Sequence, residues 1–93
     1  MADVNIVLDE DGAPENPVQK KDEITWTNRT GNTITEFQLP SCVRPKESPA
    51  PIANGATTDP FKVKDSTKKG VYEYSWTEDD PKAGPRNGTI DVN

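Results

Sequence analysis

Few residues of this chain could do chemistry, because none of its 93 residues is histidine. Histidine is the usual general base near neutral pH and the commonest ligand of transition metals. Ser41 and Cys42 are the candidate nucleophiles, and either would need a lysine or a carboxylate beside it as the base. Ser41 begins no Ser-x-x-Lys spacing and lies in no Gly-x-Ser-x-Gly turn, and the nearest cation to Cys42 is Arg44. We therefore expect no catalytic residue, a buried or half-buried thiol, and a chain that is not an enzyme.

Two acidic clusters could instead supply oxygen ligands to a cation. Residues 9–12 crowd three carboxylates before a glycine, but they lack the alternating spacing and the closing glutamate of a calcium-binding EF-hand loop. Glu78, Asp79 and Asp80 precede a proline. Neighbouring carboxylates do acid–base work only when they are partly buried at a fixed separation. Consecutive acidic residues before a proline favour a solvated loop, so a carboxylate metal site at Asp79 and Asp80 is kept as an alternative.

Charge and hydropathy restrict the possible partners. The chain has 11 basic and 16 acidic residues, a net charge of −5, which opposes binding to nucleic acid and to anionic membranes. Lys62, Lys64, Lys68 and Lys69 fit the outer side of a strand and its turn, where lysines commonly protect a sheet edge. No stretch approaches the roughly 18 apolar residues of a membrane helix, and residues 1–4 do not have the pattern of a signal peptide. We expect a monomer without a cofactor, either cytoplasmic or the mature form of an exported protein.

The spacing of apolar residues predicts strands. Nine prolines and six glycines interrupt the chain so often that no stretch has a helical period. Apolar residues alternate with polar ones in short runs bounded by turn residues, which is typical of half-buried strands. Seven such runs surround residues 4–8, 18, 24–27, 33–39, 61–63, 71–76 and 90–92, and they carry all six aromatic residues. We predict one domain, residues 1–93, built as an all-β antiparallel sandwich of about seven strands. Four prolines make residues 40–58 irregular.

Two segments carry recognisable strand motifs. Residues 22–31 read Asp-Glu-Ile-Thr-Trp-Thr-Asn-Arg-Thr-Gly, and residues 70–76 read Gly-Val-Tyr-Glu-Tyr-Ser-Trp, followed after a loop by Gly-Thr-Ile-Asp-Val at 88–92. In this order they resemble the Asp-x-Val-x-Trp-x-Asn strand and the C-terminal hairpin of the cupredoxins, the plastocyanin-like β-sandwiches. Residues 40–58 have no counterpart in that pattern. The resemblance implies a cupredoxin-like Greek-key β-sandwich.

The same resemblance argues against a copper site. Type 1 copper is held by two histidines, a cysteine and a weak axial ligand that is usually methionine. On the family's pattern these four positions fall at Ile34, Trp76, Asp79 and Pro85. Met1 is the only methionine, and Cys42 lies elsewhere in the sequence. Because isoleucine and tryptophan would fill the vacated space, we predict no bound copper and a metal end that is packed shut.

Binding is the function that remains. Prolines stiffen residues 40–52, so ordering this stretch against a partner would cost little entropy. The candidate interaction surface comprises Arg44, Pro45, Pro49, Pro51, Glu78, Asp79 and Asp80. A plainer interpretation of residues 40–52 is a crossover between the two sheets. We predict a copper-free binding or interaction module for an unknown protein or small ligand; the alternatives are a carboxylate-based metal-handling protein and an immunoglobulin-like structural domain.

Overall fold

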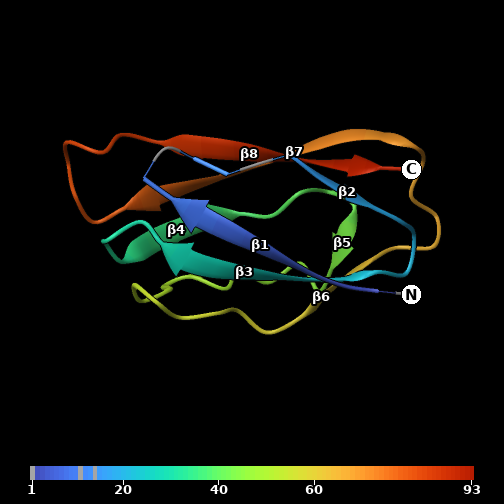
Figure 1. Cartoon of the computed structure of the whole chain (residues 1–93), viewed down its shortest axis with the longest axis horizontal. Helices are drawn as coiled ribbons and strands as arrows, with labels where there is room; N and C mark the ends of the chain where they lie inside the picture. The colour runs from blue at the N-terminus through green and yellow to red at the C-terminus, as the bar shows by residue number, and fades with distance from the viewer. Residues whose placement is uncertain (1, 11, 14) are drawn as a thin grey trace.

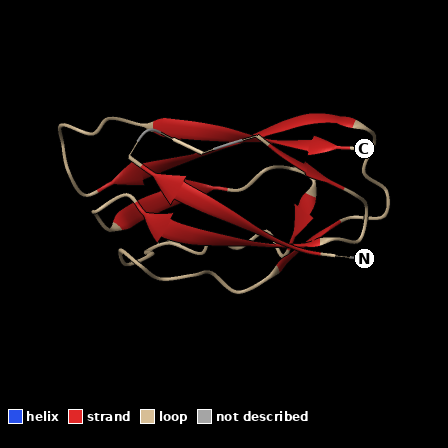
Figure 2. Cartoon of the chain, viewed as in Figure 1, coloured by secondary structure: helices blue, strands red, loops and turns tan. Residues whose placement is uncertain are grey.

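Eight strands and no helix make up the described part of the chain, which in this computed structural model comprises residues 2–10, 12–13 and 15–93. The strands are β1 (Asp3–Asp9), β2 (Asn16–Val18), β3 (Glu23–Arg29), β4 (Ile34–Gln38), β5 (Val43–Arg44), β6 (Phe61–Val63), β7 (Gly70–Glu78) and β8 (Arg86–Val92). They form two four-stranded sheets (Figure 1), joined by turns and loops alone (Figure 2). The predicted all-β sandwich is confirmed, with eight strands rather than about seven. Nothing in the described residues amounts to a helix long and apolar enough to cross a membrane.

The first sheet has the order β1-β3-β6-β5. β1 and β3 run parallel, with Ile6 opposite Trp26, while β6 runs antiparallel to both β3 and β5. Apolar residues alternate along β1 and β3 at Ile6, Leu8, Ile24 and Trp26, which is why the sequence pattern located these strands, and the polar Asn28 continues the inward row of β3.

The second sheet has the order β2-β8-β7-β4. Its long antiparallel hairpin joins β7 to β8, from Gly70 opposite Val92 to Trp76 opposite Arg86. β4 pairs antiparallel with β7, whereas β2 pairs parallel with β8. β1–β3 and β2–β8 are parallel pairs, so the prediction of an antiparallel sandwich is wrong for these two pairs. After β1 the chain crosses to the second sheet and forms β2, and it then returns to the first sheet as β3. β3 therefore lies beside β1 and runs in the same direction.

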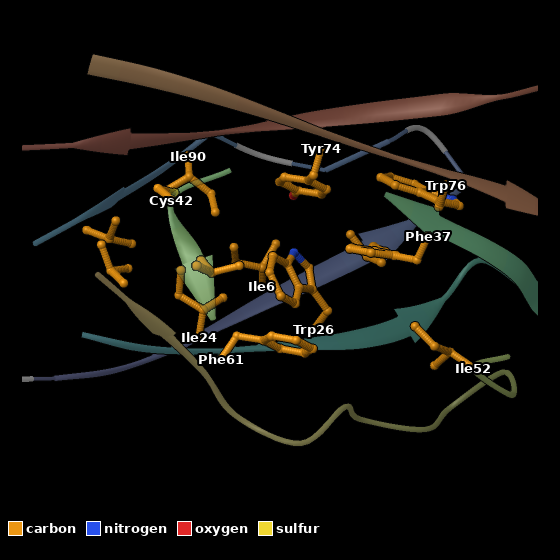
Figure 3. Packing of buried hydrophobic residues seen from close by; sticks show 14 of the residues in the cluster. Ile6, Ile24, Trp26, Phe37, Cys42, Ile52, Phe61, Tyr74, Trp76 and Ile90 are labelled. Carbon is orange, nitrogen blue, oxygen red and sulfur yellow. The ribbon is translucent and has the colours of Figure 1, made fainter. Parts of the chain in front are cut away.

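Aromatic rings dominate the core between the sheets. Trp26 lies at its centre, with ring centroids 5.1 Å from Phe37, 5.5 Å from Phe61 and 5.4 Å from Tyr74 (Figure 3). The prediction that the aromatic residues build the core is confirmed, since five of the six are buried and Tyr72 packs against them from the side. A Cβ atom at Gly88 would lie 2.5 Å from the Tyr74 ring, so glycine is required where β8 passes this ring.

Residues 40–58 lie between β4 of the second sheet and β6 of the first. The crossing itself is made by residues 39–42, from β4 in the second sheet to β5 in the first, whereas residues 45–60 join β5 to β6 within the first sheet. The crossover interpretation therefore holds only for the beginning of residues 40–52. The stretch is not wholly irregular, because Val43 and Arg44 form the short strand β5 at a sheet edge. The following proline, Pro45, lacks the N–H that a longer strand would need.

The two ends of the sandwich differ in what they carry. Ala2 and Asn93 lie at one end, where their backbones bond to Glu23 and Val18 (Figure 1). We call it the terminus end. At the opposite end Ile34 pairs with Glu78 on one side and bridges to Ile52 on the other. We call it the closed end, because all three of these residues are buried there.

Candidate functional site

Ile34 and Trp76 fill the interior of the closed end. Ile34 is 0% exposed and Trp76 is 2% exposed, and both are held on paired strands of the second sheet. The other two positions expected for copper ligands, Asp79 and Pro85, are exposed in the loop between β7 and β8. Cys42 lies at the other end of the core (Figure 3). The four positions therefore offer no set of soft ligands around one point.

Glu78 is buried at the closed end, and the expectation of a solvated carboxylate is wrong for this residue. Its Oε2 accepts hydrogen bonds from the Trp76 indole N–H over 3.1 Å and from Arg86 Nε over 2.9 Å. Its Oε1 accepts a bond of 3.0 Å from Asn32 Nδ2. The side chain of Glu78 is 1% exposed and that of Arg86 is 26% exposed, so this ion pair is shielded on one side only. It is the one ion pair between residues that the structure describes.

The hydrogen bonds of Glu78 continue into the first sheet through Asn28. Asn28 Nδ2 donates to the carbonyl oxygens of Asn32 and Ile52 over 2.8 and 2.9 Å. Its Oδ1 accepts from the N–H and the hydroxyl of Thr30 over 3.0 and 2.7 Å. Asn28 is 0% exposed, and all four of these bonds lie at the closed end. A polar network therefore joins β3, β7, β8 and the segment at Ile52. This network lies at the closed end, which is where the cupredoxin pattern would place a metal.

Two buried groups have perturbed acidity. Burial raises the pKa of the Cys42 thiol, and the backbone and the charge of Lys64 offset part of that rise. Such a thiol is a poor nucleophile at neutral pH. Burial also raises the pKa of Tyr74 to about 12, and the nearby Trp26 indole reduces the rise. The Tyr74 hydroxyl and the Trp26 N–H face each other (Figure 3), but neither has a hydrogen-bond partner among the described residues.

A groove of about 500 Å³ opens along residues 45–61. One wall is the outgoing arm, residues 45–51, and the other is the returning arm, residues 57–61, with Ile52 and Ala53 at the turn between them. The arms are tied to the sandwich. Ile52 exchanges two backbone bonds of 2.9 Å with Ile34, and Thr58 N–H donates to Trp26 O over 2.8 Å. The groove is thus part of the folded framework.

The predicted interaction surface is divided by the structure. Pro45, Pro49 and Pro51 line the groove. Arg44 lies outside it on β5, exposed beside Lys62. Asp79 and Asp80 lie in the loop between β7 and β8, whereas Glu78 is buried at the end of β7. The returning arm was missed by the sequence analysis, although the Asp-Pro at 59–60 before a strand is a turn signal.

Solved structures of amicyanin, a cupredoxin, have the same arrangement of strands. They include the reduced form of a tryptophan-to-tyrosine mutant (TM-score 0.66, 15% identity), the Cu(I) form of a proline-to-glycine mutant at pH 4 (TM-score 0.65, 16% identity) and the Cu(I) form of a methionine-to-alanine mutant (TM-score 0.63, 16% identity). This chain has the cupredoxin fold. Each match covers 97% of this chain and 81% of the amicyanin chain. No protein-family model and no curated protein matches the sequence.

The cupredoxin fold is retained here without the residues that suit type 1 copper. Isoleucine and tryptophan side chains fill the two interior positions, and a buried carboxylate, rather than a thiolate, lies beside them. Within the described residues, no group of three or more histidine, cysteine, aspartate or glutamate side chains is placed to hold a metal ion. Asp79 and Asp80 thus lack a third ligand of these types among the described residues, and the carboxylate metal site is not favoured. The immunoglobulin-like alternative is not favoured either, since immunoglobulin sheets are antiparallel and β1–β3 is parallel.

Proposed function

We propose that this chain is a binding module that holds no type 1 copper and catalyses no reaction, and that its ligand lies in the groove between residues 45–51 and 57–61. The groove itself is the observation that carries the proposal. Its volume of about 500 Å³ is within the range of small-molecule sites, roughly 300–1,000 Å³. It opens beside the closed end, where the side chains of Ile34 and Trp76 are buried.

The lining of the groove favours a ligand with an apolar body and a cationic or N–H-donating end. Proline rings and Phe61 supply apolar contact area. Glu47 and Asp59 add one exposed carboxylate on each arm, and neither carboxylate is in an ion pair with another described residue. The outgoing arm is held at its two ends by β5 and Ile52, and the returning arm is bonded to β3 at Thr58. Because of these attachments, little conformational entropy would be lost on binding. Groove and charge together support recognition of an aromatic or aliphatic amine.

Two ring compounds of opposite charge test this proposal. Benzylamine and benzoate are titrated separately into ¹⁵N-labelled protein, and amide chemical shifts are followed by NMR. We expect saturable shifts at Thr57, Thr58 and Phe61 with benzylamine and weaker shifts with benzoate, while Thr89 on the second sheet stays unchanged.

Matched variants locate the binding site. Asp59→Asn should weaken benzylamine binding about threefold, the effect of one exposed charge contact. Glu73→Gln removes an equally exposed carboxylate outside the groove and should leave the affinity unchanged. Shifts scattered over the surface, or no saturable shift at the groove with either compound, would contradict the proposal.

A further inference from the structure

The terminus end gathers positive charge on an acidic chain. Seven of the 11 basic residues lie on β5, on β6 or in loops at this end: Lys20, Lys21, Arg44, Lys62, Lys64, Lys68 and Lys69. Backbone bonds hold these segments together, since Lys21 N–H donates to Val63 O over 3.0 Å and Lys64 N–H donates to Cys42 O over 2.9 Å. The loops that follow β2 and β6 both lie at this end (Figure 1). We call the seven residues the basic end patch.

Arg44 and Lys62 place like charges opposite each other. They are direct partners in the antiparallel pair β5–β6, so their side chains share one face of the sheet. Like charges in this arrangement destabilise a sheet. Glu23 lies opposite Lys62 on its other side, yet among the described residues neither Lys62 nor Arg44 forms an ion pair. Asp3 lies opposite Glu23 on β1, so the row across the sheet has its two carboxylates toward β1 and its two cations toward the β5 edge. The cations at that edge are the part of the row that an external negative charge would meet.

The carboxylates of the adjoining loops do not neutralise the patch. Asp22 is buried, and its two oxygens accept backbone N–H bonds from Ala2 over 2.9 Å and from Gln19 over 2.8 Å. Asp65 is exposed but forms no ion pair with a described residue. Lys64 Nζ bonds to a carbonyl oxygen, that of Ser41, over 3.2 Å. Asp3, Glu23 and Asp91 lie on strands at the same end, so the seven cations of the patch exceed the five carboxylates around them by two.

The composition and the size of the patch favour a short acidic polypeptide. Six of its seven members are lysines, which act as hydrated point charges, whereas phosphate recognition favours the bidentate geometry of arginine. The domain is 37 Å long, several times the screening length of about 8 Å at physiological salt. A short acidic segment bound at the patch would be screened from the negative charges on the rest of the chain. A long polyanion or an anionic membrane would extend to those charges and be repelled by them. We propose that the basic end patch docks an acidic segment of a partner protein.

A fluorescein-labelled peptide of alternating glutamate and glycine tests this docking by fluorescence anisotropy. We expect saturable binding at low salt that weakens at physiological salt. The double variant Arg44→Glu with Lys62→Glu should bind about tenfold more weakly, because two favourable charge contacts become repulsive. A second double variant, Lys68→Glu with Lys69→Glu, should also lose affinity without altering any strand.

The matched control is Arg29→Glu with Lys82→Glu, which makes the same change in net charge at the closed end. It should keep the affinity of the wild type within about twofold, since those sites lie beyond the screening length. Equal losses in the control, or no saturable binding by the wild type, would overturn the proposal. So would tighter binding of a single-stranded oligonucleotide or of phosphatidylserine vesicles than of the peptide. Self-association in sedimentation experiments that the patch variants abolish would make a second copy of this chain the occupant instead.

Discussion

At the closed end the Glu78 carboxylate brings together hydrogen-bond donors from strands and loops at one point. It accepts hydrogen bonds from Trp76, Arg86 and Asn32. A buried carboxylate is costly unless such partners surround it. Removing the carboxylate therefore leaves several donors without an acceptor, which is usually worse than the loss of one bond.

We expect Glu78→Ala to lower the free energy of unfolding by about 2 kcal/mol, less than for a fully enclosed pair because Arg86 is 26% exposed. Chemical denaturation followed by tryptophan fluorescence measures the change. Asp79→Ala is the matched control, and its effect should stay within about 0.5 kcal/mol because Asp79 is exposed. Similar losses of unfolding free energy in the two variants would show that the hydrogen bonds of Glu78 stabilise the fold no more than an exposed carboxylate does.

Tyr74 supplies a prediction about alkaline pH. Its pKa is about 12 in the folded chain and near 10 when unfolded. The unfolded state therefore loses this proton first, so the contribution of Tyr74 to stability is full below pH 10 and falls as the pH rises toward 12. Tyr74→Phe should flatten the decline over this range and change stability at neutral pH by about 1 kcal/mol or less, because the hydroxyl has no partner among the described residues. Denaturation curves of both proteins across this pH range measure it, and identical slopes would contradict the account.

The burial of Glu78 could have been predicted from the spacing of the residues along its strand. Tyr74, Trp76 and Glu78 follow one another at the two-residue spacing of a strand, so all three face the same side. We predicted that the strand ends at Trp76 because three acidic residues before a proline have the composition of a loop. The alternation continues two residues further, and that periodicity was the available signal. The half-buried partners Asn32 and Arg86 come from other elements, which no local pattern could identify.

At the scale of elements, Asn28 fixes the shape of the groove. It lies at the end of β3 and binds the carbonyl oxygen of Ile52, where the outgoing arm turns back. The ladder of backbone bonds between Ile34 and Ile52 lies directly beside it. A polar side chain in the first sheet thus sets the position of a loop that the sequence could only describe as irregular.

Asn28→Ala should loosen the closed end before the rest of the sandwich. We expect faster hydrogen exchange at the amides of Ile34 and Ile52, with a smaller change at Asn93, whose amide bonds to Val18 at the terminus end. The stability should fall by about 2 kcal/mol, because the Ile52 and Asn32 carbonyls lose a buried donor. Asn87→Ala replaces an exposed asparagine and is the control. Uniform acceleration at every amide would mean that Asn28 has no local role.

The elements themselves were largely predictable, and their partners were not. Alternating residues such as Ile6 and Leu8 located β1 because their period of two is a local property. The parallel pairing of β1 with β3 depends on the return of a distant segment, which no such period encodes. β5 was missed because it has only two residues before Pro45. The Greek-key order of connections between the strands, which the resemblance to cupredoxins implies, stays a prediction.

At the scale of the whole molecule, the cupredoxin fold is shared with amicyanin at 15–16% identity. In this chain the space between the sheets is filled by Trp26 with its surrounding rings, and Gly88 lets β8 pass beside Tyr74. We propose two surfaces for function, the groove and the basic end patch, which adjoin where Pro45 and Phe61 of the groove follow Arg44 and precede Lys62 of the patch. A fold reused for many purposes does not name a ligand, so both surfaces must be tested directly.

We propose that packed side chains occupy the place of a type 1 copper site. The chain is equilibrated with excess Cu(II) and, separately, with Cu(I), freed of unbound metal by gel filtration, and assayed for copper content and visible absorption, with amicyanin as the positive control. We expect far less than one copper per chain and no intense blue band, because Ile34 and Trp76 occupy the interior positions and neither can ligate a metal. Stoichiometric copper with an intense blue absorption would contradict it.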